Sequence, residues 1–472
     1  MHTIDKIYIN GEFVTPHGSE RFNLYNPATE SVIGTVRLAD EQDARSAIAA
    51  AKAAFPAWSR TSVAERIAVL EAMHQAVAAC EDELMEAIIL EYGAPAERCR
   101  WMAQYPADVI AQAIEALREY QFEITAGTAQ VIMTPVGVAG LITPWNSDAG
   151  FICNKLATAM AAGCTAVIKP SEMSALQTEV ITRALHQAKI PAGVMNIVTG
   201  RGDVVGEVIN LHPDIAKISF TGSTAVGRHI VETGAATMKR VTLELGGKSP
   251  TILMDDVDLE QALPLIIGAG FMNSGQACVA GTRILVAQSR LAETERCLAQ
   301  AVAAIPVGDP RNASTEIGPM VSQKQWQRVQ DYIHLGIAEG AKVLAGGEGR
   351  PEGLNAGWFV RPTLFSNANN QMRIAREEIF GPVLTIIPYR DDEEAIAIAN
   401  DTAYGLSAMV LGADRERAVK IARQIEAGRV LVNTLSHEPK APFGGFKQSG
   451  MGREMGQWGL SAYLEPKTLL VG

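Results

Sequence analysis

The sequence predicts an α/β protein built around two sheets of mostly parallel strands. Strand-length apolar runs alternate with helical stretches over residues 136–245, and a second alternation begins near residue 249. This rhythm is typical of parallel sheets covered by helices on both faces. Of the 472 residues, 47% are hydrophobic and 20% are charged, a mix that can bury large cores and that excludes wholesale disorder.

Short strands and two long helices are expected before the first alternation. Strand-like runs separated by turns fill residues 6–36. Asp40 is placed to cap a helix, which we expect to end at Pro56 because proline has no backbone N–H to donate. Ser62 and Glu65 form the capping-box pattern of a second helix, in which apolar residues recur at helical spacing.

The expected strands fall into two groups along the chain. Sheets of this kind bind ligands at the carboxyl ends of their strands, so polar residues just after a strand are the first candidates for a site. Between the last two strands, residues 414–427 predict a charged amphipathic helix that Gly428 ends. The first group consists of residues 136–142, 165–168, 195–198, 215–220 and 241–245, and the second of residues 251–253, 283–286, 383–388, 407–411 and 430–433.

Two further segments are expected to lie apart from these sheets. Residues 120–134 have an alternating pattern that suits a projecting hairpin, and residues 462–471 predict another strand. Together, the hairpin and the tail could bridge subunits.

Charge and composition exclude several classes of partner and location. The chain has 41 Lys and Arg against 52 Asp and Glu, a net charge of −11, and no basic cluster of the kind that binds nucleic acid. Residues 1–14 lack the apolar core of a signal peptide, and the apolar stretches at 156–168 and 262–272 contain glycine and are too short to span a membrane. The six cysteines show no CxxC spacing, so we expect no disulfide framework, no metal site and a reducing, cytoplasmic location.

A glycine turn after the strand at 215–220 has the features of a phosphate site. Gly222 and Ser223 form the turn, and a helix containing Gly227 follows. The first turn of such a helix offers free N–H groups and the positive end of the helix dipole to a pyrophosphate. The glycine spacing differs from the GxGxxG fingerprint, so an ordinary strand–helix turn is the alternative interpretation.

Lys169 and Glu172 follow the strand at 165–168 and could both contact ribose hydroxyls. A carboxylate at this position would repel the additional phosphate of NADP, which favours NAD as the coenzyme. The alternative interpretation is a surface ion pair, usually worth under about 1 kcal/mol.

Cys278 lies in a run of small residues, after a helix expected to end near Asn273 and Ser274. A reactive thiol needs partial exposure and neighbours that lower its pKa, and small neighbours allow a substrate to approach. The alternative is a buried, inert cysteine, which is the common state of free thiols. That alternative is adopted for the other cysteines, which are Cys80, Cys99, Cys153, Cys164 and Cys297.

Two more polar residues follow apolar strands. Glu244 would have a raised pKa in a dry pocket, which suits a general base, although it could instead pair with Lys248. Asn146 could donate a hydrogen bond to a developing oxyanion, although an ordinary asparagine turn is the alternative.

Taken together, these motifs resemble those of the aldehyde dehydrogenase superfamily of NAD(P)-dependent enzymes, essentially from end to end of the chain. Their order and wide dispersal make the resemblance specific. The matching motifs are Pro144-Trp145-Asn146, Lys169-Pro170-Ser171-Glu172, Phe220-Thr221-Gly222-Ser223, Leu243-Glu244-Leu245-Gly246-Gly247-Lys248, Gly275-Gln276-Ala277-Cys278, Glu377-Glu378-Ile379-Phe380-Gly381-Pro382, and Pro442-Phe443-Gly444-Gly445 running to Gly450-Met451-Gly452-Arg453-Glu454.

The resemblance implies an aldehyde dehydrogenase-like fold with three parts. A Rossmann-like coenzyme domain would comprise residues 1–118 and 136–246, and an α/β catalytic domain residues 247–446. Residues 119–135 and 447–472 would form a β oligomerisation arm and tail. Homodimers or homotetramers are usual in the family.

The resemblance also implies NAD-dependent oxidation of a small-molecule aldehyde to a carboxylic acid. Cys278 resembles the nucleophile that forms a thiohemiacetal and then a thioester, and Glu244 the base that activates water to hydrolyse it. Asn146, with the Cys278 N–H, resembles the oxyanion hole. Lys155 and Glu454 match positions proposed to assist proton movement. The implied coenzyme contacts are Trp145, Lys169, Glu172, Gly222, Ser223, Gly227, Leu245, Glu378 and Phe380.

The substrate side departs from the family pattern. Ser147 and Asp148 stand where many members have an aromatic residue and a proline, and the loop at 436–440 is polar. We therefore expect a roomier or more hydrophilic entrance that suits polar or semialdehyde substrates. The residues expected on this side are Phe151, Asn154, His437 and Phe443.

Three other interpretations stay open. A coenzyme A-acylating aldehyde dehydrogenase would pass the thioester to a thiol, but that branch tends to lack the glutamate found here as Glu244. A cysteine hydrolase without redox chemistry needs a paired base, usually histidine, and none of the eight histidines lies in such a motif. A non-catalytic protein could also keep the scaffold.

Overall fold

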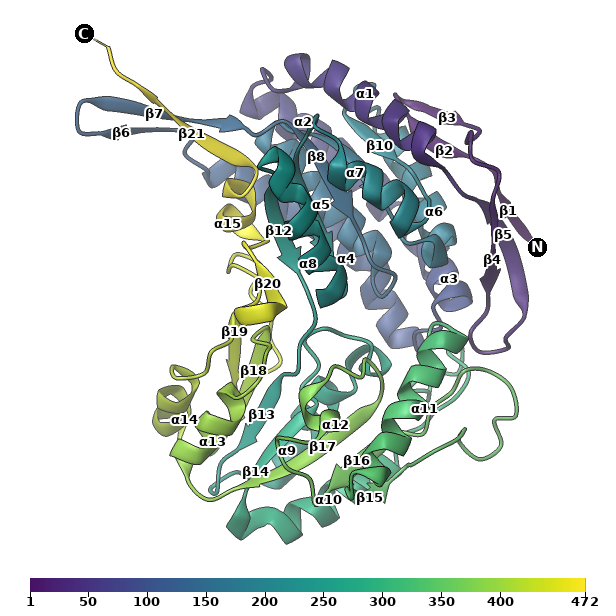
Figure 1. Ribbon diagram of the computed structural model, residues 1–472, viewed down its shortest axis with the longest axis vertical. Coiled ribbons are helices and arrows are strands. Elements are labelled where there is room, and N and C mark those ends of the chain that lie inside the picture. The colour runs from purple at the N-terminus through teal and green to yellow at the C-terminus, as the bar shows by residue number, and fades with distance from the viewer. Residues whose placement is uncertain (472) are drawn as a thin grey trace.

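The structure is a computed structural model that describes residues 1–471. Figure 1 shows two lobes, each built around one sheet, with a hairpin projecting from the first lobe. The larger sheet has eight strands, of which the middle ones are parallel and the edge ones antiparallel. Their order is β20 (Gly450–Met451), β12 (Arg240–Glu244), β11 (Ile215–Thr221), β8 (Val138–Ile142), β9 (Thr165–Lys169), β10 (Met195–Ile197), β2 (Ile7–Ile9) and β3 (Glu12–Val14).

Helices cover both faces of the larger sheet, as its buried parallel strands require. Alternate residues of β9 point to opposite faces of the sheet. Val167 packs in a first hydrophobic cluster on one face, and Ala166 and Ile168 pack in a second cluster on the other. The first cluster includes α1 (Glu41–Trp58), α7 (Glu207–Leu211) and α8 (Thr224–Gly234), and the second includes α2 (Val63–Ala78), α3 (Glu81–Glu91), α4 (Ala96–Glu119), α5 (Asp148–Ala162) and α6 (Ala175–Gln187).

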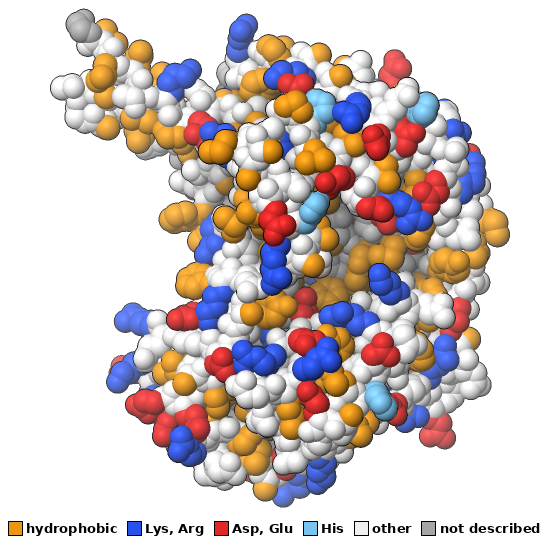
Figure 2. Space-filling model, in the orientation of Figure 1, with side chains coloured by type: hydrophobic (Ala, Val, Ile, Leu, Met, Phe, Trp, Pro, Cys, Tyr) orange, Lys and Arg blue, Asp and Glu red, His pale blue; other side chains and the backbone are white. Residues whose placement is uncertain are grey.

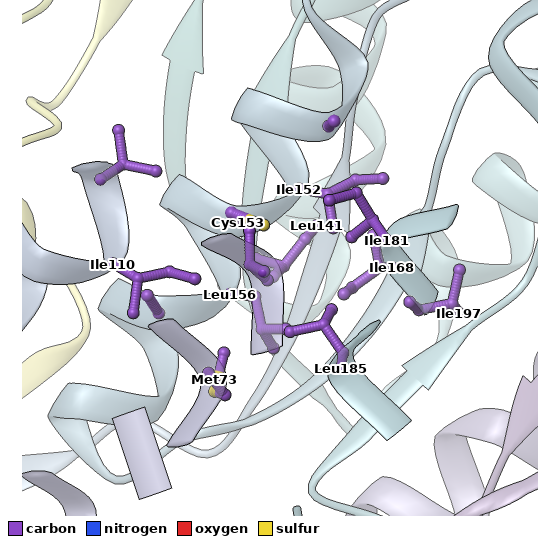
Figure 3. Packing of buried hydrophobic residues seen from close by; sticks show 14 of the residues in the cluster. Met73, Ile110, Leu141, Ile152, Cys153, Leu156, Ile168, Ile181, Leu185 and Ile197 are labelled. Carbon is purple, nitrogen blue, oxygen red and sulfur yellow. The ribbon is translucent and has the colours of Figure 1, made fainter. Parts of the chain in front are cut away.

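The second of these clusters positions the start of α5. Figure 3 shows Leu141 and Ile168 of the sheet meeting Ile152 of α5 and Ile181 of α6, and all four side chains are fully buried. Close packing of this kind leaves little freedom to the helix. Because α5 begins two residues after Asn146, the core also fixes the turn that carries this asparagine.

The second sheet has seven strands, and only its first pair is antiparallel. The strand order is β15 (Lys342–Ala345), β16 (Thr363–Ser366), β17 (Val383–Tyr389), β14 (Arg283–Ala287), β13 (Pro250–Leu253), β18 (Ser407–Leu411) and β19 (Arg429–Val432). The first two of these strands, β15 and β16, are not predicted by the sequence pattern. The helices packed around this sheet are α9 (Leu259–Gly270), α10 (Leu291–Ala303), α11 (Gln323–Ala338), α12 (Arg373–Arg376), α13 (Asp392–Asn400) and α14 (Arg415–Ala422).

Two small sheets complete the fold. The predicted hairpin is confirmed as β6 (Glu123–Ala126) and β7 (Ala129–Pro135), and the predicted tail strand, β21 (Leu464–Leu469), pairs with β7 after the short helix α15 (Gly456–Ser461). The other small sheet joins β1 (His2–Ile4), β5 (Val32–Arg37) and β4 (Arg21–Tyr25). No helix in residues 1–471 is both long enough and apolar enough to cross a bilayer.

The predicted helix starts are confirmed, but two predicted helix ends are wrong. Pro56 does not end α1, which continues to Trp58, because the N–H of Ser59 still donates to the Phe55 carbonyl and carries the turn past the proline. The helix predicted over residues 414–427 ends at Ala422. Beyond Ala422, the side chain of Asn400 takes the place of further helical hydrogen bonds. Its amide N–H donates to the carbonyl of residue 424, and its amide oxygen accepts from the N–H of residue 426.

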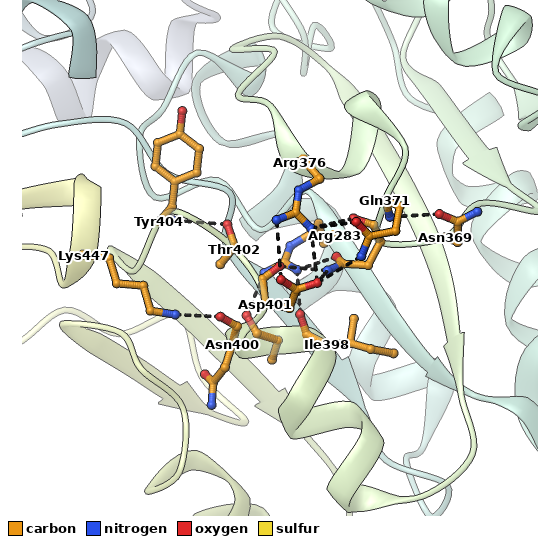
Figure 4. A network of polar contacts seen from close by, with 12 residues as sticks. Arg283, Asn369, Gln371, Arg376, Ile398, Asn400, Asp401, Thr402, Tyr404 and Lys447 are labelled. Atoms are coloured by element: carbon orange, nitrogen blue, oxygen red, sulfur yellow. Dashed lines mark hydrogen bonds and ion pairs between the residues drawn. The ribbon is translucent and has the colours of Figure 1, made fainter.

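A buried arginine anchors the chain where it passes from the first sheet to the second. Arg283 is completely buried, and its guanidinium donates to the Lys248 carbonyl, to Asn370 Oδ1 and to the carbonyls of Ile398 and Ala399 (Figure 4). Burial lowers the pKa of Arg283 to about 10. Oxygen acceptors thus satisfy this structural arginine without a direct carboxylate partner.

Removing the side chain of Ile181 should test the first-lobe core. Ile181→Ala should lower the free energy of unfolding by about 2–5 kcal/mol, because it loses buried apolar surface and leaves a cavity. Denaturant unfolding followed by circular dichroism measures the change. Ile337→Ala is the matched control, because Ile337 is also on a helix but is 44% exposed, whereas Ile181 is 0% exposed. Equal effects of the two changes would contradict this account of the core.

Candidate active site

Two connected hollows lie between the lobes, where β11 and β12 of the first sheet end and where β13, β18 and β19 of the second sheet begin. Figure 2 shows the face of the molecule hollowed between its upper and lower parts. The hollow that we call the large groove has a volume of about 1410 Å³, and the one that we call the small cavity has a volume of about 430 Å³. Five residues line both and mark the place where they meet: Asn146, Phe151, Thr221, Glu244 and Cys278.

A strained turn presents Cys278 at this meeting place. Asn273, Ser274 and Gly275 all have positive φ angles (56°, 59° and 77°), and a Cβ on Gly275 would lie 2.2 Å from the backbone of Gly381. Asparagine side chains hold the turn: Asn273 Nδ2 donates to the Asn146 carbonyl at 3.0 Å, and Asn146 Nδ2 donates to the Gln276 carbonyl at 3.0 Å. An amide NH₂ has two protons, so Asn146 keeps one to donate to a ligand.

The surroundings of Cys278 favour its neutral thiol. Burial raises the pKa of Cys278 to about 12, and the carboxyl groups of Glu378 and Glu244 add to the shift, while Arg429 opposes it. The side chain is nevertheless partly exposed. Of the other cysteines expected to be buried, Cys99, Cys153 and Cys164 are fully buried, whereas Cys80 and Cys297 are partly exposed, so the prediction of burial is wrong for these two.

Glu244 ends β12 and has no direct charge partner. Its side chain is only 3% exposed, and neither carboxyl oxygen has a hydrogen-bond partner among the residues that the structure describes. Burial raises the pKa of Glu244 well above its ordinary value, and the nearby Glu454 raises it further. The alternative pairing with Lys248 is not observed. A dry carboxyl group of this kind suits proton transfer.

Lys155 and Glu454 form a buried ion pair beside the small cavity. Lys155 Nζ donates to Glu454 Oε1 at 2.5 Å and to Ser219 Oγ at 2.9 Å. Asn154, which the sequence predicts on the substrate side, lines the small cavity and donates to Glu454 Oε2 at 3.2 Å. The pair therefore joins α5 to the segment just before α15.

The structure brings most of the expected coenzyme residues together in the large groove. Its lining includes Trp145, Gly222, Ser223, Leu245, Glu378 and Phe380. Lys169 and Glu172 form an ion pair at 3.4 Å and do not line the groove, although the adjacent Met173 does. Gly227 does not line it either: a Cβ there would lie 2.6 Å from the Leu245 side chain, so this glycine allows close packing of α8.

The large groove has the features that an extended, partly anionic ligand needs. Ser223 accepts from the N–H of Val226 and caps α8, whose amino-terminal end borders the groove. Trp145 and Phe380 stand edge to face, with ring centroids 5.5 Å apart. Gly246 leaves room beside Glu378, since a Cβ there would lie 2.3 Å from Oε2 of that residue. Among residues 1–471, no group of three His, Cys, Asp or Glu side chains is arranged to hold a metal ion.

The small cavity contains the expected substrate residues and several that sequence reasoning missed. Phe151, Asn154, His437 and Phe443 all line it. Four more side chains come from α4 and β19: Arg98, Trp101, Tyr105 and Arg429. No motif marks these positions, and only the packing of α4 beside α5 brings the first three to the site.

Comparison with known proteins finds a family match and relatives that cover nearly the whole chain. The aldehyde dehydrogenase family model matches residues 13–469. A 3-succinoylsemialdehyde-pyridine dehydrogenase from a Pseudomonas species is 45% identical over 472 residues, covering 100% of this chain and 99% of that protein. A putative aldehyde dehydrogenase of Staphylococcus aureus is 44% identical and covers 99% of both chains.

Solved structures show the same architecture. A mutant of aldehyde dehydrogenase C from Pseudomonas syringae, in complex with NAD⁺ and octanal, has a TM-score of 0.97 at 45% identity, over 99% of this chain and 97% of that one. The Mycobacterium tuberculosis aldehyde dehydrogenase complexed with NAD⁺ has a TM-score of 0.97 at 39% identity, over 100% and 98% of the two chains. The α/β architecture predicted from the sequence is therefore confirmed.

The raised pKa of Cys278 predicts slow alkylation at neutral pH. Below the pKa, the thiolate fraction rises about tenfold per pH unit, so labelling by iodoacetamide without coenzyme should accelerate by about a hundredfold between pH 7 and pH 9. Peptide-resolved mass spectrometry measures the rate at Cys278. The fully buried Cys153 is the reference and should stay unlabelled. A rate that levels off below pH 9 would show that the thiol ionises more easily than this environment allows.

Proposed function

The chain belongs to the aldehyde dehydrogenase family and is an NAD-dependent aldehyde dehydrogenase, and from this premise we propose that Cys278, Glu244 and Asn146 carry out its reaction. The observation that carries this proposal is that the three side chains line both the large groove and the small cavity. A nucleophile at that place can reach an aldehyde on one side and a coenzyme on the other.

The chain's own groups account for the first covalent step. The Cys278 thiol gives its proton to the ionised form of Glu244, which passes it to solvent. Sγ then adds to the aldehyde carbon, and the carbonyl oxygen becomes the oxyanion of a thiohemiacetal. Asn146 Nδ2 and the backbone N–H of Cys278 donate to this oxyanion, and one such donor is typically worth about 3 kcal/mol. Bound NAD⁺ supplies the hydride acceptor for the oxidation that leaves a thioester on Cys278.

Glu244 completes the reaction. Its carboxylate removes a proton from water, the water oxygen attacks the thioester carbon, and the acid is released as the Cys278 thiol forms again. We infer that Lys155 and Glu454 act as positioning residues, because Glu454 lines the small cavity and raises the pKa of Glu244. A glutamate at this place favours hydrolysis over transfer of the acyl group to coenzyme A.

We propose that the large groove is the NAD site. Trp145, Gly222, Ser223, Leu245, Glu378 and Phe380 would hold the coenzyme there, and the amino-terminal end of α8 suits its pyrophosphate. Lys169 ends β9 and Glu172 follows it beside the groove, and we assign both residues to the adenosine ribose. The carboxylate of Glu172 would disfavour the additional phosphate of NADP.

We also propose the subunit organisation that the sequence suggests. Residues 1–118 and 136–246 would form the coenzyme domain, residues 247–446 the catalytic domain, and residues 119–135 and 447–472 the arm and tail. Exposed apolar side chains on the projecting hairpin and tail strand, including Ile124 and Leu469, support contact with another subunit in a homodimer or homotetramer (Figure 2).

Glu244→Gln tests the assignment of the base. This change should lower steady-state turnover by about a hundredfold or more while a stoichiometric burst of NADH remains, because the thioester still forms and only its hydrolysis is slowed. Stopped-flow absorbance at the NADH band measures both phases. Cys278→Ala is the control and should abolish burst and turnover together. Loss of the burst in Glu244→Gln would place the glutamate in an earlier step.

Glu172→Ser tests the assignment of coenzyme preference. Removing the carboxylate should raise the ratio of kcat/KM with NADP to kcat/KM with NAD by about tenfold, since a like charge no longer faces the additional phosphate. Steady-state kinetics with both coenzymes measure the ratio. Glu232→Ser is the matched control, because Glu232 is an exposed glutamate on α8. An unchanged ratio in Glu172→Ser would remove this residue from coenzyme selection.

A further inference from the structure

The small cavity contains two arginines that no protein carboxylate neutralises. Arg98, on α4, makes no hydrogen bond or ion pair among the described residues, and its Nε is fully buried without a partner. Its guanidinium lies 3.9 Å from the ring centroid of Trp101. Burial lowers the pKa of Arg98, and the ionisable groups that oppose this shift are Tyr92, Tyr105 and Cys99, none of which is a carboxylate.

Arg429 reaches the same cavity from β19. Its Nε donates to Ser407 Oγ at 3.3 Å, and its guanidinium lies 5.9 Å from the ring centroid of Phe443. Burial lowers the pKa of Arg429, and Cys278 is the acidic group that opposes this shift. Arg429 thus lines the cavity that also contains Cys278. Its terminal nitrogens have no hydrogen-bond acceptor among residues 1–471.

The carboxyl groups in the cavity do not compensate for these charges. Glu454 is already held by Lys155, Ser219 and Asn154. Glu244 has a pKa raised well above its ordinary value, which favours its neutral form. His437 also lines the cavity, and burial and Arg429 lower its pKa, which favours its uncharged form, so it neither neutralises the arginines nor adds to their charge.

Two arginines without a carboxylate partner in one cavity destabilise the folded protein unless a ligand supplies a negative charge. Both side chains are partly buried, and an unpaired charge with little access to water is destabilising in a folded protein. Elsewhere this chain satisfies its arginines: Arg283 has four oxygen acceptors, and Arg417 pairs with Asp255 and Asp392. The two arginines of the small cavity therefore differ from these structural ones, because their terminal nitrogens have no acceptor among the described residues and neither has a carboxylate partner.

We propose that the small cavity binds a substrate that carries a carboxylate at the end opposite its aldehyde, with Arg429 and Arg98 as the carboxylate-binding residues. The proposal rests on the proposed function, because the aldehyde end is placed at Cys278. A guanidinium presents its N–H groups in a planar fork that matches a carboxylate. The volume of about 430 Å³ and the walls formed by Trp101, Phe151 and Phe443 accommodate a carbon chain or an aromatic ring between the two ends.

Matched substrate pairs test the proposal with the wild-type enzyme. The pairs are 4-carboxybenzaldehyde with benzaldehyde, and 6-oxohexanoate with hexanal, each assayed by NADH formation. The carboxylated member should have a kcat/KM about 10- to 100-fold higher, as expected for a charge-assisted hydrogen-bonded contact. Equal or lower values for both carboxylated members would overturn the proposal, and so would a preference for glyceraldehyde 3-phosphate over both.

Arginine variants locate the contact. In Arg429→Gln and Arg98→Gln, the ratio of kcat/KM for the carboxylated member to that for the uncharged member should fall by about 10- to 100-fold in at least one variant, mainly through KM. Arg423→Gln is the matched control, because Arg423 is an exposed arginine of the same lobe as Arg429, and its ratio should not change. An unchanged ratio in both cavity variants would refute the assignment.

Two further measurements separate the possible failures. Terephthalate and adipate, the dicarboxylate products of the two pairs, should inhibit the wild type competitively against the uncharged aldehydes, which tests anion binding even if a variant does not fold. Absence of this inhibition would count against the carboxylate site. If no aldehyde of any kind yields NADH, the proposed function itself fails, whereas NADH from uncharged aldehydes without a carboxylate preference defeats only this inference.

Discussion

The site depends on one close contact between the chain that links the two sheets and the turn that presents Cys278. A Cβ on Gly247 would lie 2.4 Å from the Cys278 carbonyl oxygen, so only glycine allows this approach. The N–H of Gly247 also donates to Glu378 Oε1 at 3.0 Å. Directly before this link, Glu244 ends β12, and directly after it Arg283 holds the Lys248 carbonyl. One short segment thus positions Glu378 together with the two residues that we propose as base and nucleophile.

The same close packing disfavours the charged forms of the ionisable groups in the site. Burial moves each ionisable group towards its neutral form: the pKa of Glu378 rises to about 7, that of Lys248 falls to about 7, and those of Glu244 and Cys278 rise. Taken together, these shifts oppose ionisation of the thiol at neutral pH. In the proposed reaction, the first step is therefore loss of the Cys278 proton, which only the ionised form of Glu244 can accept.

Sequence reasoning captured the parts of this arrangement that are local. Strand-length apolar runs gave the positions of β8, β9 and β11–β14, and side-chain caps such as Asp40 and Ser62 gave helix starts, because these signals act over a few residues. Helix ends that depend on distant partners were wrong, as the role of Asn400 beyond Ala422 shows. Motif residues were found through a family resemblance. Arg98 and Arg429 were not predicted as site residues, because the sequence does not show that their side chains lack carboxylate partners. Only the three-dimensional structure shows this.

The unpaired arginines and the glycine link are connected by the geometry of the two lobes. Arg98 belongs to α4, which packs on the first sheet, whereas Arg429 begins β19 of the second. The separation between these two charges is therefore set by how the lobes are joined, and residues 244–248 with Arg283 form part of that joint. Since the same joint positions Cys278, the distance from the nucleophile to each positive charge is built into the scaffold. If the substrate carries a carboxylate, as we propose, selectivity for its length would follow from backbone packing and not from the chemistry of the cavity walls alone.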